Sequence, residues 1–176
     1  MHLCVLGDLV ESVSGLNHPN TWKSLGSGMY GYNVIILAYK LIKKHLLERI
    51  NNLHTVYIVP GNHDRFTIAS NVDNVGGVGG LLAFMLQENT DLNVVYNDLI
   101  ISREIDGINY LMTHGHHKFS NDHVKLVNDY GRSDIYNVCL SAHWHTRRAK
   151  KTNSRKPIEY EGVSMISVDE LNYRGS

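Results

Sequence analysis

Short apolar runs alternate with helical patterns in the first half of the chain. Leu3–Leu6 and Thr55–Val59 are continuous hydrophobic runs, which are typical of buried parallel strands. Apolar residues recur at helical spacing from Tyr32 to Ile50, with charged residues on the other faces, and predict an amphipathic helix. A second helix is expected over Leu81–Gln87. The Gly-, Ser- and Asn-rich segment Ser12–Gly31 has no such periodicity and is expected to be a functional loop.

The second half of the chain is richer in strand patterns. Leu99–Ile105 and Ile108–Thr113 flank Asp106-Gly107, a two-residue turn that favours a β-hairpin. The remaining elements that we expect are a short helix from Asp122 to Tyr130, a strand at Tyr136–Ser141, and one or two strands within Ile158–Val168. This order of elements predicts a layered α/β or α+β fold with functional residues at the carboxyl ends of strands.

Composition and charge are those of a globular protein. The chain has 176 residues, of which 43% are hydrophobic and 19% charged, and these values predict one domain over residues 1–176. The net charge is zero, which argues against a uniformly basic nucleic-acid surface. Charge is nevertheless uneven, because Arg147–Lys156 contains six Lys or Arg and no acid. This basic run is expected either to contact a DNA or RNA backbone or to be a solvated loop.

The cysteines favour a reducing compartment, and the lengths of the apolar runs argue against a membrane-spanning segment. Cys4 and Cys139 lie in separate predicted strands without CxxC spacing, so we interpret them as core thiols. No run approaches the ~20 apolar residues that span a bilayer. Met1–Leu6 lacks the features of a secretion signal. A cytoplasmic protein that does not bind a membrane is expected.

Four polar clusters each follow a short apolar run. They are Gly7-Asp8, Gly61-Asn62-His63-Asp64, Thr113-His114-Gly115-His116 and Ala142-His143-Trp144-His145. Each cluster alone is compatible with turn chemistry or surface histidines. Together they bring Asp and Asn oxygens and His nitrogens to strand ends, and this mixture suits divalent cations. The H-x-H spacing of His143 and His145 also puts both imidazoles on one face of an extended segment.

Taken together, the clusters resemble the signature of the calcineurin-like metallophosphoesterases, most closely the phosphodiesterase and DNA-exonuclease branch. That signature is D-x-H, G-D-x-x-[D/E], G-N-H-[D/E], H-G and G-H-x-H. The matching segments are Gly7-Asp8-Leu9-Val10-Glu11, Gly61-Asn62-His63-Asp64, His114-Gly115 and His143-Trp144-His145. The resemblance extends from Asp8 to His145. It implies an α/β fold in which a layered β-sandwich is flanked by helices.

The resemblance implies a pair of divalent metal ions. Asp8 would bridge the two ions, His145 would bind the first, and Asn62, His114 and His143 would bind the second. Mn²⁺ is the expected metal, with Fe or Zn as alternatives. Two such ions hold a phosphoryl group and lower the pKa of a bridging water, which then attacks phosphorus.

The resemblance also implies the remaining chemistry. His63 would protonate the leaving oxygen or stabilise developing charge, and Asp64 would orient it. Glu11 would contact the metal ligands rather than the metal itself. The implied activity is hydrolysis of a phosphodiester, with DNA or RNA as candidate substrates.

Two positions depart from the signature. The D-x-H motif is missing, since only six residues precede Gly7 and none is Asp, and Ala142 replaces the first Gly of G-H-x-H. The first ion would keep only Asp8 and His145, and the first strand of the sheet would be absent. We therefore expect an N-terminally incomplete domain: a fragment, a split enzyme completed by a polypeptide that carries the D-x-H segment, or a degenerate member. An interaction module that keeps the fold without the chemistry is the alternative function.

Overall fold

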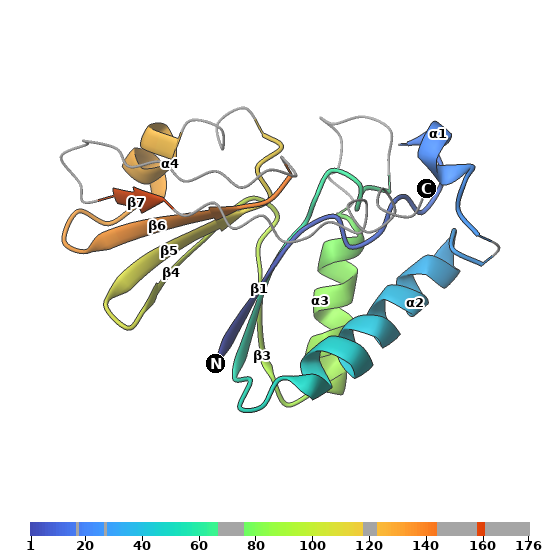
Figure 1. The fold of residues 1–176 in the computed structure, drawn as a ribbon, viewed down its shortest axis with the longest axis horizontal. Coiled ribbons are helices and arrows are strands. Elements are labelled where there is room, and N and C mark those ends of the chain that lie inside the picture. The colour runs from blue at the N-terminus through green and yellow to red at the C-terminus, as the bar shows by residue number, and fades with distance from the viewer. Residues whose placement is uncertain (17, 27, 67–75, 118–122, 144–157, 161–176) are drawn as a thin grey trace, which may run out of the picture. The chain divides into compact units, whose positions relative to one another are not determined.

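The computed structural model shows a mixed α/β fold with two small sheets (Figure 1). It describes residues 1–16, 18–26, 28–66, 76–117, 123–143 and 158–160. The chain divides into two compact units, Met1–Leu99 and Ile100–Ser176. The α/β class expected from the sequence is confirmed at this level, whereas the single domain over residues 1–176 stays a prediction.

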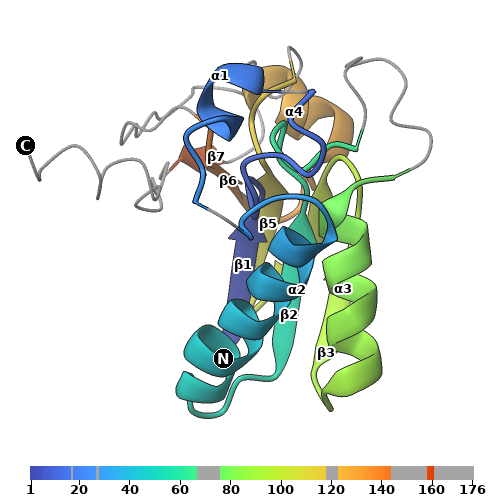
Figure 2. The same cartoon turned by 90° about the vertical axis from the view of Figure 1, so that its right-hand side faces the viewer.

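The first unit is a three-stranded parallel sheet with helices against one face. The strands are β1 (His2–Leu6), β2 (Thr55–Val59) and β3 (Asn93–Tyr96), in the order β1-β2-β3. Helices α2 (Tyr32–Leu41) and α3 (Val78–Asn89) lie side by side on this face (Figure 2). Every residue of β2 is buried, as expected for a central strand made only of β-branched and aromatic residues.

The core of this unit lies between the sheet and the two helices. Val56 and Ile58 of β2 pack with Leu86 of α3, while Val34 of α2 packs with Leu82 of α3. These side chains are almost fully removed from water. Burying an aliphatic side chain of this size stabilises the fold by roughly 1.5–3 kcal/mol, so the contacts hold the strand ends in place.

The helices differ from the sequence prediction in two ways. The predicted helix Tyr32–Ile50 is α-helical only to Leu41 and continues as a π-helical turn (Ile42–Leu46) and a 3₁₀ turn (Leu47–Arg49). Helix α3 begins at Val78 rather than Leu81, so that Gly79 and Gly80 lie inside it. Tight packing explains the glycines, because a Cβ on Gly79 would lie 3.0 Å from Pro60 and one on Gly80 3.2 Å from the Tyr96 ring.

Two short elements of the first unit were not predicted. Strand β3 has a recognisable signal in Val94, Val95 and Tyr96, whose β-branched and aromatic side chains favour strands. Helix α1 (Pro19–Trp22) is a single turn inside the expected loop, with Pro19 at its start, where proline is favoured.

The second unit is a four-stranded mixed sheet. Its elements are β4 (Ile101–Ile105), β5 (Ile108–Thr113), α4 (His123–Tyr130), β6 (Tyr136–Ser141) and β7 (Ile158–Tyr160). Strands β4 and β5 form the predicted hairpin, and β6 and β7 add in parallel. Asp106 and Gly107 have φ values of 50° and 79°, as a tight hairpin turn requires. The rest of the segment predicted to contain further strands lies outside the described residues.

Both cysteines are at least partly buried as free thiols in strands. Cys4 in β1 is half-buried and Cys139 in β6 is buried, and neither forms a disulfide with the other. Burial raises the pKa of the Cys139 thiol to about 12. Among the described residues, no helix has the length and apolar character needed to cross a bilayer.

A buried pair of asparagines joins β5 to β6. Asn109 Nδ2 donates to Asn137 Oδ1 at 2.9 Å, and the Arg132 backbone N–H donates to the same oxygen at 2.8 Å. Asn137 Nδ2 in turn donates to the carbonyl oxygen of Arg132 at 2.6 Å. Asn137 is 0% exposed, so water cannot replace it as the hydrogen-bond partner of these groups.

We expect Asn137→Ala to destabilise the second unit. The substitution leaves buried polar groups of Asn109 and Arg132 without their partner, at a cost of about 2–4 kcal/mol. The measurement is the free energy of unfolding in urea, with hydrogen exchange of the β5 and β6 amides as the readout. Asn93→Ala, at an exposed position, is the matched control. Equal stability of the two variants would contradict the structural role of the asparagine pair.

Candidate functional site

The loops that follow β1 and β2 lie against each other and carry Asp8 and Asn62. The two parallel strands stay in register up to Leu6 and Val59, so their loops leave from neighbouring points. A Cβ on Gly61 would lie 2.0 Å from Asp8 Oδ1 and 2.2 Å from the Asp8 nitrogen. Only glycine fits at this contact. Packing against Asp8 therefore requires glycine at position 61, whatever the role of Asn62.

The Asp8 side chain is held by the second loop. The backbone N–H of His63 donates to Asp8 Oδ1 at 3.1 Å. Asp8 also has a φ of 53°, in the left-handed region that L-residues rarely adopt. Neighbouring Gly7, with a φ of 84°, allows the chain to turn there.

Asp64 fastens the two loops together. Its Oδ1 accepts the backbone N–H groups of Leu9 at 2.6 Å and Val10 at 3.1 Å, and its Oδ2 accepts that of Gly61 at 2.8 Å. The residue is 1% exposed. A single buried carboxylate thus holds backbone from segments more than fifty residues apart.

Burial raises the pKa of the Asp64 carboxyl to about 6, and the nearby charge of Asp8 acts in the same direction. The backbone hydrogen bonds from Gly61, Val10 and Leu9 oppose this by stabilising the ionised form. The buried carboxylate is retained because it has these three donors.

We expect Asp64→Ala to destabilise the first unit strongly. The change leaves three backbone N–H groups without an acceptor, and at about 1–3 kcal/mol for each buried group the total cost is on the order of 3–9 kcal/mol. The measurement is the free energy of unfolding from hydrogen exchange of the β1 and β2 amides. The exposed Asp91, changed to Ala, serves as control. A loss below about 1 kcal/mol, the usual range for an exposed site, would contradict this role.

Glu11 rather than Asp64 contacts the His63 ring. Glu11 Oε2 lies 3.1 Å from His63 Nδ1, and the Thr21 hydroxyl donates to Glu11 Oε1. We expected Asp64 to orient His63, but all the hydrogen bonds of its carboxylate described above go to backbone N–H groups. Among the described residues, Glu11 is the carboxylate that contacts the His63 ring, and an orienting role for Asp64 stays a prediction. The Glu11 carboxylate accepts a hydrogen bond from Nδ1–H of His63, and Nε2 is then the ring nitrogen that Glu11 does not hold.

A second imidazole lies on His63. The rings of His18 and His63 are stacked, with centroids 3.7 Å apart and planes inclined by 4°. Burial lowers the pKa of His18 and the adjacent His63 lowers it further, which favours a neutral ring. Sequence analysis missed His18 because it lies in the irregular loop, outside every recognised motif.

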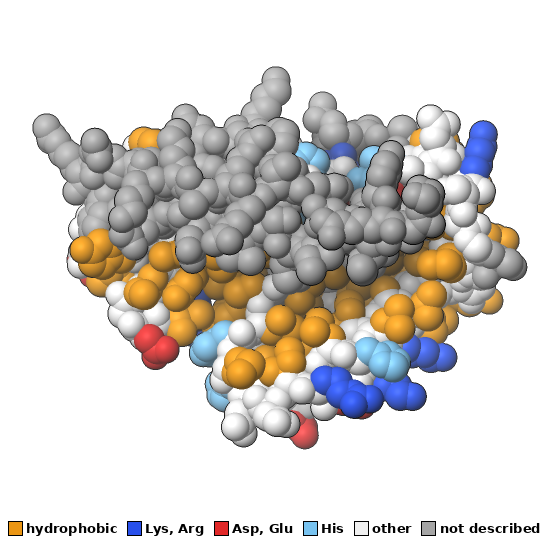
Figure 3. Space-filling view, viewed as in Figure 1, with side chains coloured by type: hydrophobic (Ala, Val, Ile, Leu, Met, Phe, Trp, Pro, Cys, Tyr) orange, Lys and Arg blue, Asp and Glu red, His pale blue; other side chains and the backbone are white. Residues whose placement is uncertain are grey.

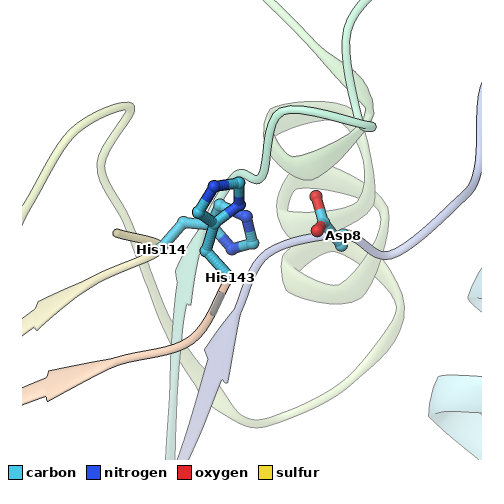
Figure 4. Close-up of side chains that lie close together, drawn as sticks. All are labelled: Asp8, His114 and His143. Atoms are coloured by element: carbon cyan, nitrogen blue, oxygen red, sulfur yellow. The ribbon is translucent and has the colours of Figure 1, made fainter. Parts of the chain in front are cut away.

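In the second unit, His114 and His143 leave the ends of adjacent parallel strands. Thr113 of β5 pairs with Ser141 of β6, and the Ala142 N–H continues the ladder by donating to the His114 carbonyl at 3.0 Å. The two rings are turned toward each other with centroids 5.1 Å apart (Figure 4). His143 has a φ of 68°, again in the left-handed region.

His116 adds a third imidazole to this group. Its ring centroid lies 5.2 Å from that of His114 and 6.2 Å from that of His143. Gly115 between the histidines has a φ of 103°, which favours glycine and brings His116 back toward the strand end. His116 is therefore a candidate functional residue that the motif itself did not assign.

Each unit thus gathers its own share of the predicted residues. The first unit brings together Asp8, Asn62, His63 and Asp64, and the second brings together His114 and His143. Asp8 is the remaining side chain in Figure 4, on the loop after β1. His145, Trp144 and the basic run Arg147–Lys156 lie outside the described residues.

The donor set in these loops suits a divalent cation. A carboxylate, an amide oxygen and imidazole nitrogens are the ligands that Mn²⁺, Fe²⁺ and Zn²⁺ accept. Two further groups bear on proton transfer, the His63 imidazole and its Glu11 partner. No known protein-family model matches the chain, and no curated protein matches it significantly in sequence.

Proposed function

We propose that this chain is a metal-dependent phosphodiesterase of the calcineurin-like metallophosphoesterase type. The observation that carries the proposal is that both units present their motif residues at the carboxyl ends of adjacent parallel strands. Asp8 follows β1 and Asn62 follows β2, while His114 follows β5 and His143 follows β6. Turns without a shared function would have no reason to gather ligand side chains in this way.

Backbone strain supports the same interpretation. The described non-glycine residues with positive φ are Asp8, Asn52, Asp106 and His143. Asp106 belongs to a hairpin turn, whereas Asp8 and His143 are predicted ligands at strand ends. A left-handed residue costs roughly 1–2 kcal/mol. Strain of this kind persists where the surrounding structure enforces it, often at functional sites.

In the proposal, the ligands of a divalent cation are those that the resemblance implies, Asp8, Asn62, His114 and His143. The layered β-sandwich flanked by helices is part of the proposal. When bound, divalent metal lowers the pKa of coordinated water and stabilises charge on phosphorus oxygens. A second cation would need His145 together with a D-x-H motif.

His63 is proposed to protonate the leaving oxygen. Glu11 holds Nδ1, so the Nε2–H of the imidazolium is the proton to be donated. Glu11 Oε2 fixes the ring through Nδ1, and the Thr21 hydroxyl fixes the other oxygen of Glu11. Asp64 supports this chemistry by fixing the loop on which His63 lies.

The substrate class is proposed to be a phosphodiester, with nucleic acid as a candidate. Figure 3 shows the described Lys and Arg side chains of one face in small groups rather than in a continuous patch. The basic run Arg147–Lys156 is thus the strongest sequence feature for contacting a nucleic-acid backbone. A small diester without a nucleobase is the suitable first substrate, because it tests the chemistry separately from recognition.

We expect His63→Ala to remove most of the hydrolysis of bis(4-nitrophenyl) phosphate in the presence of Mn²⁺. Loss of a general acid typically lowers the rate by about 10²–10⁴-fold. The measurement is kcat together with metal content, which should stay at the unsubstituted value. His45→Ala, at an exposed position, is the control. Unchanged turnover in His63→Ala would remove His63 from the mechanism.

Metal content tests the ligand set directly. We expect purified protein to carry at least one stoichiometric divalent ion, and His114→Ala to lose it because a buried nitrogen ligand is removed. Elemental analysis after dialysis gives the readout, again with His45→Ala as control. An interaction module that kept only the fold would carry no stoichiometric metal in either variant.

A further inference from the structure

His18 lies flat against the ring of His63, although no motif in the sequence contains it. The two planes are inclined by 4° with centroids 3.7 Å apart. His18 Nε2 is buried and has no hydrogen-bond partner among the described residues. A buried nitrogen is not available to a substrate. The contact that His18 makes with His63 is therefore through the face of its ring.

The segment that carries His18 is anchored on the first unit. His18 precedes α1, and its carbonyl oxygen accepts the N–H of Trp22 at 2.9 Å. Trp22 packs on Gly15, where a Cβ would lie 2.3 Å from the indole, and the Gly15 N–H donates to buried Ser12 Oγ at 3.1 Å. The indole also contacts Tyr30 edge-on. The loop thus has its own packing, which holds His18 where it is.

The same segment reaches the opposite side of the Glu11–His63 pair. Thr21 of α1 donates its hydroxyl to Glu11 Oε1, while Glu11 Oε2 contacts His63 Nδ1. One short helix therefore acts on His63 twice, through a ring face and through the carboxylate that holds Nδ1. Both contacts restrict rotation of the imidazole.

A metal site formed by Glu11, His18 and His63 is the competing interpretation. The three side chains each offer a ligand atom, all within 4.8 Å of one another. An imidazole nitrogen directs its lone pair in the plane of the ring, however. Two nearly parallel planes stacked at 3.7 Å do not direct both lone pairs at one ion. The stacked geometry therefore favours positioning over ligation.

We propose that His18 is a positioning residue, and that with Thr21 it fixes the His63 ring so that Nε2 points to the leaving oxygen. This inference rests on the proposed phosphodiesterase function for its catalytic consequence. The segment before α2 would then have a function of its own, which is to hold the His63 ring in place. His18 acts on His63 through its ring face, so another flat ring of similar size should keep that contact, although it loses the hydrogen bond of the His18 ring to the Asn62 backbone.

The test compares His18→Ala with His18→Phe in the full chain, on two diesters with Mn²⁺. Bis(4-nitrophenyl) phosphate has a good leaving group that needs little protonation, and diphenyl phosphate has a poor one that needs more. We expect His18→Ala to lower kcat about tenfold on diphenyl phosphate and about threefold or less on the nitrophenyl diester, with little change in KM. His18→Phe should keep most of both activities, and Thr21→Val should resemble His18→Ala.

A second readout does not depend on activity. Long-range ¹H–¹⁵N correlation spectra report which nitrogen of His63 carries the proton. We expect the Nδ1–H form in the unsubstituted protein and in His18→Phe, and a mixture of tautomers in His18→Ala. The exposed His45, changed to Ala, should alter neither the spectrum of His63 nor the rates.

The outcomes separate the two proposals. If the unsubstituted protein hydrolyses neither diester, the proposed function fails and the tautomer of His63 alone decides whether His18 positions the ring. If His18→Ala keeps both the rates and the tautomer, the positioning role is overturned. One equivalent of Zn²⁺ that is lost in His18→Phe but kept in His114→Ala, measured by calorimetry, would overturn it in favour of a metal site.

Discussion

The first unit depends on one buried carboxylate that holds three backbone N–H groups. Asp64 joins Leu9, Val10 and Gly61, so the loops after β1 and β2 cannot separate without exposing unpaired donors. An isolated buried charge would be costly, and these donors are what make it tolerable here. The position of Asp8, the contact at Gly61 and the orientation of the His63 backbone all follow from this connection.

Because the loops are fixed, side chains with chemical function can be held in strained positions. Asp8 keeps a left-handed backbone against a glycine that admits no Cβ. His63 is presented with its Nδ1 against Glu11 and its face against His18. The loops of the first unit are therefore held by hydrogen bonds to backbone N–H groups, and the His63 imidazole is held by side-chain contacts.

In the second unit, strand pairing rather than a buried carboxylate holds the candidate side chains in place. Its two histidines, His114 and His143, are placed by the parallel ladder between β5 and β6, which continues one bond past the strands to His114. The buried Asn109–Asn137 pair holds the opposite end of those strands. Because two paired parallel strands end side by side, a His directly after each strand gives a pair of neighbouring imidazoles, and no long loop is needed to bring them together.

The sequence by itself determined the elements that local patterns encode. β2, β5 and β6 have the predicted bounds because continuous apolar runs and the Asp106-Gly107 turn are local signals. The sequence also singled out Asp8, His63, His114 and His143, since each follows such a run. Only the tertiary structure decided that Glu11 rather than Asp64 contacts the His63 ring, and that His18 stacks on it. Those contacts join a loop without periodicity to a strand end about fifty residues away, and no local pattern encodes such a pairing.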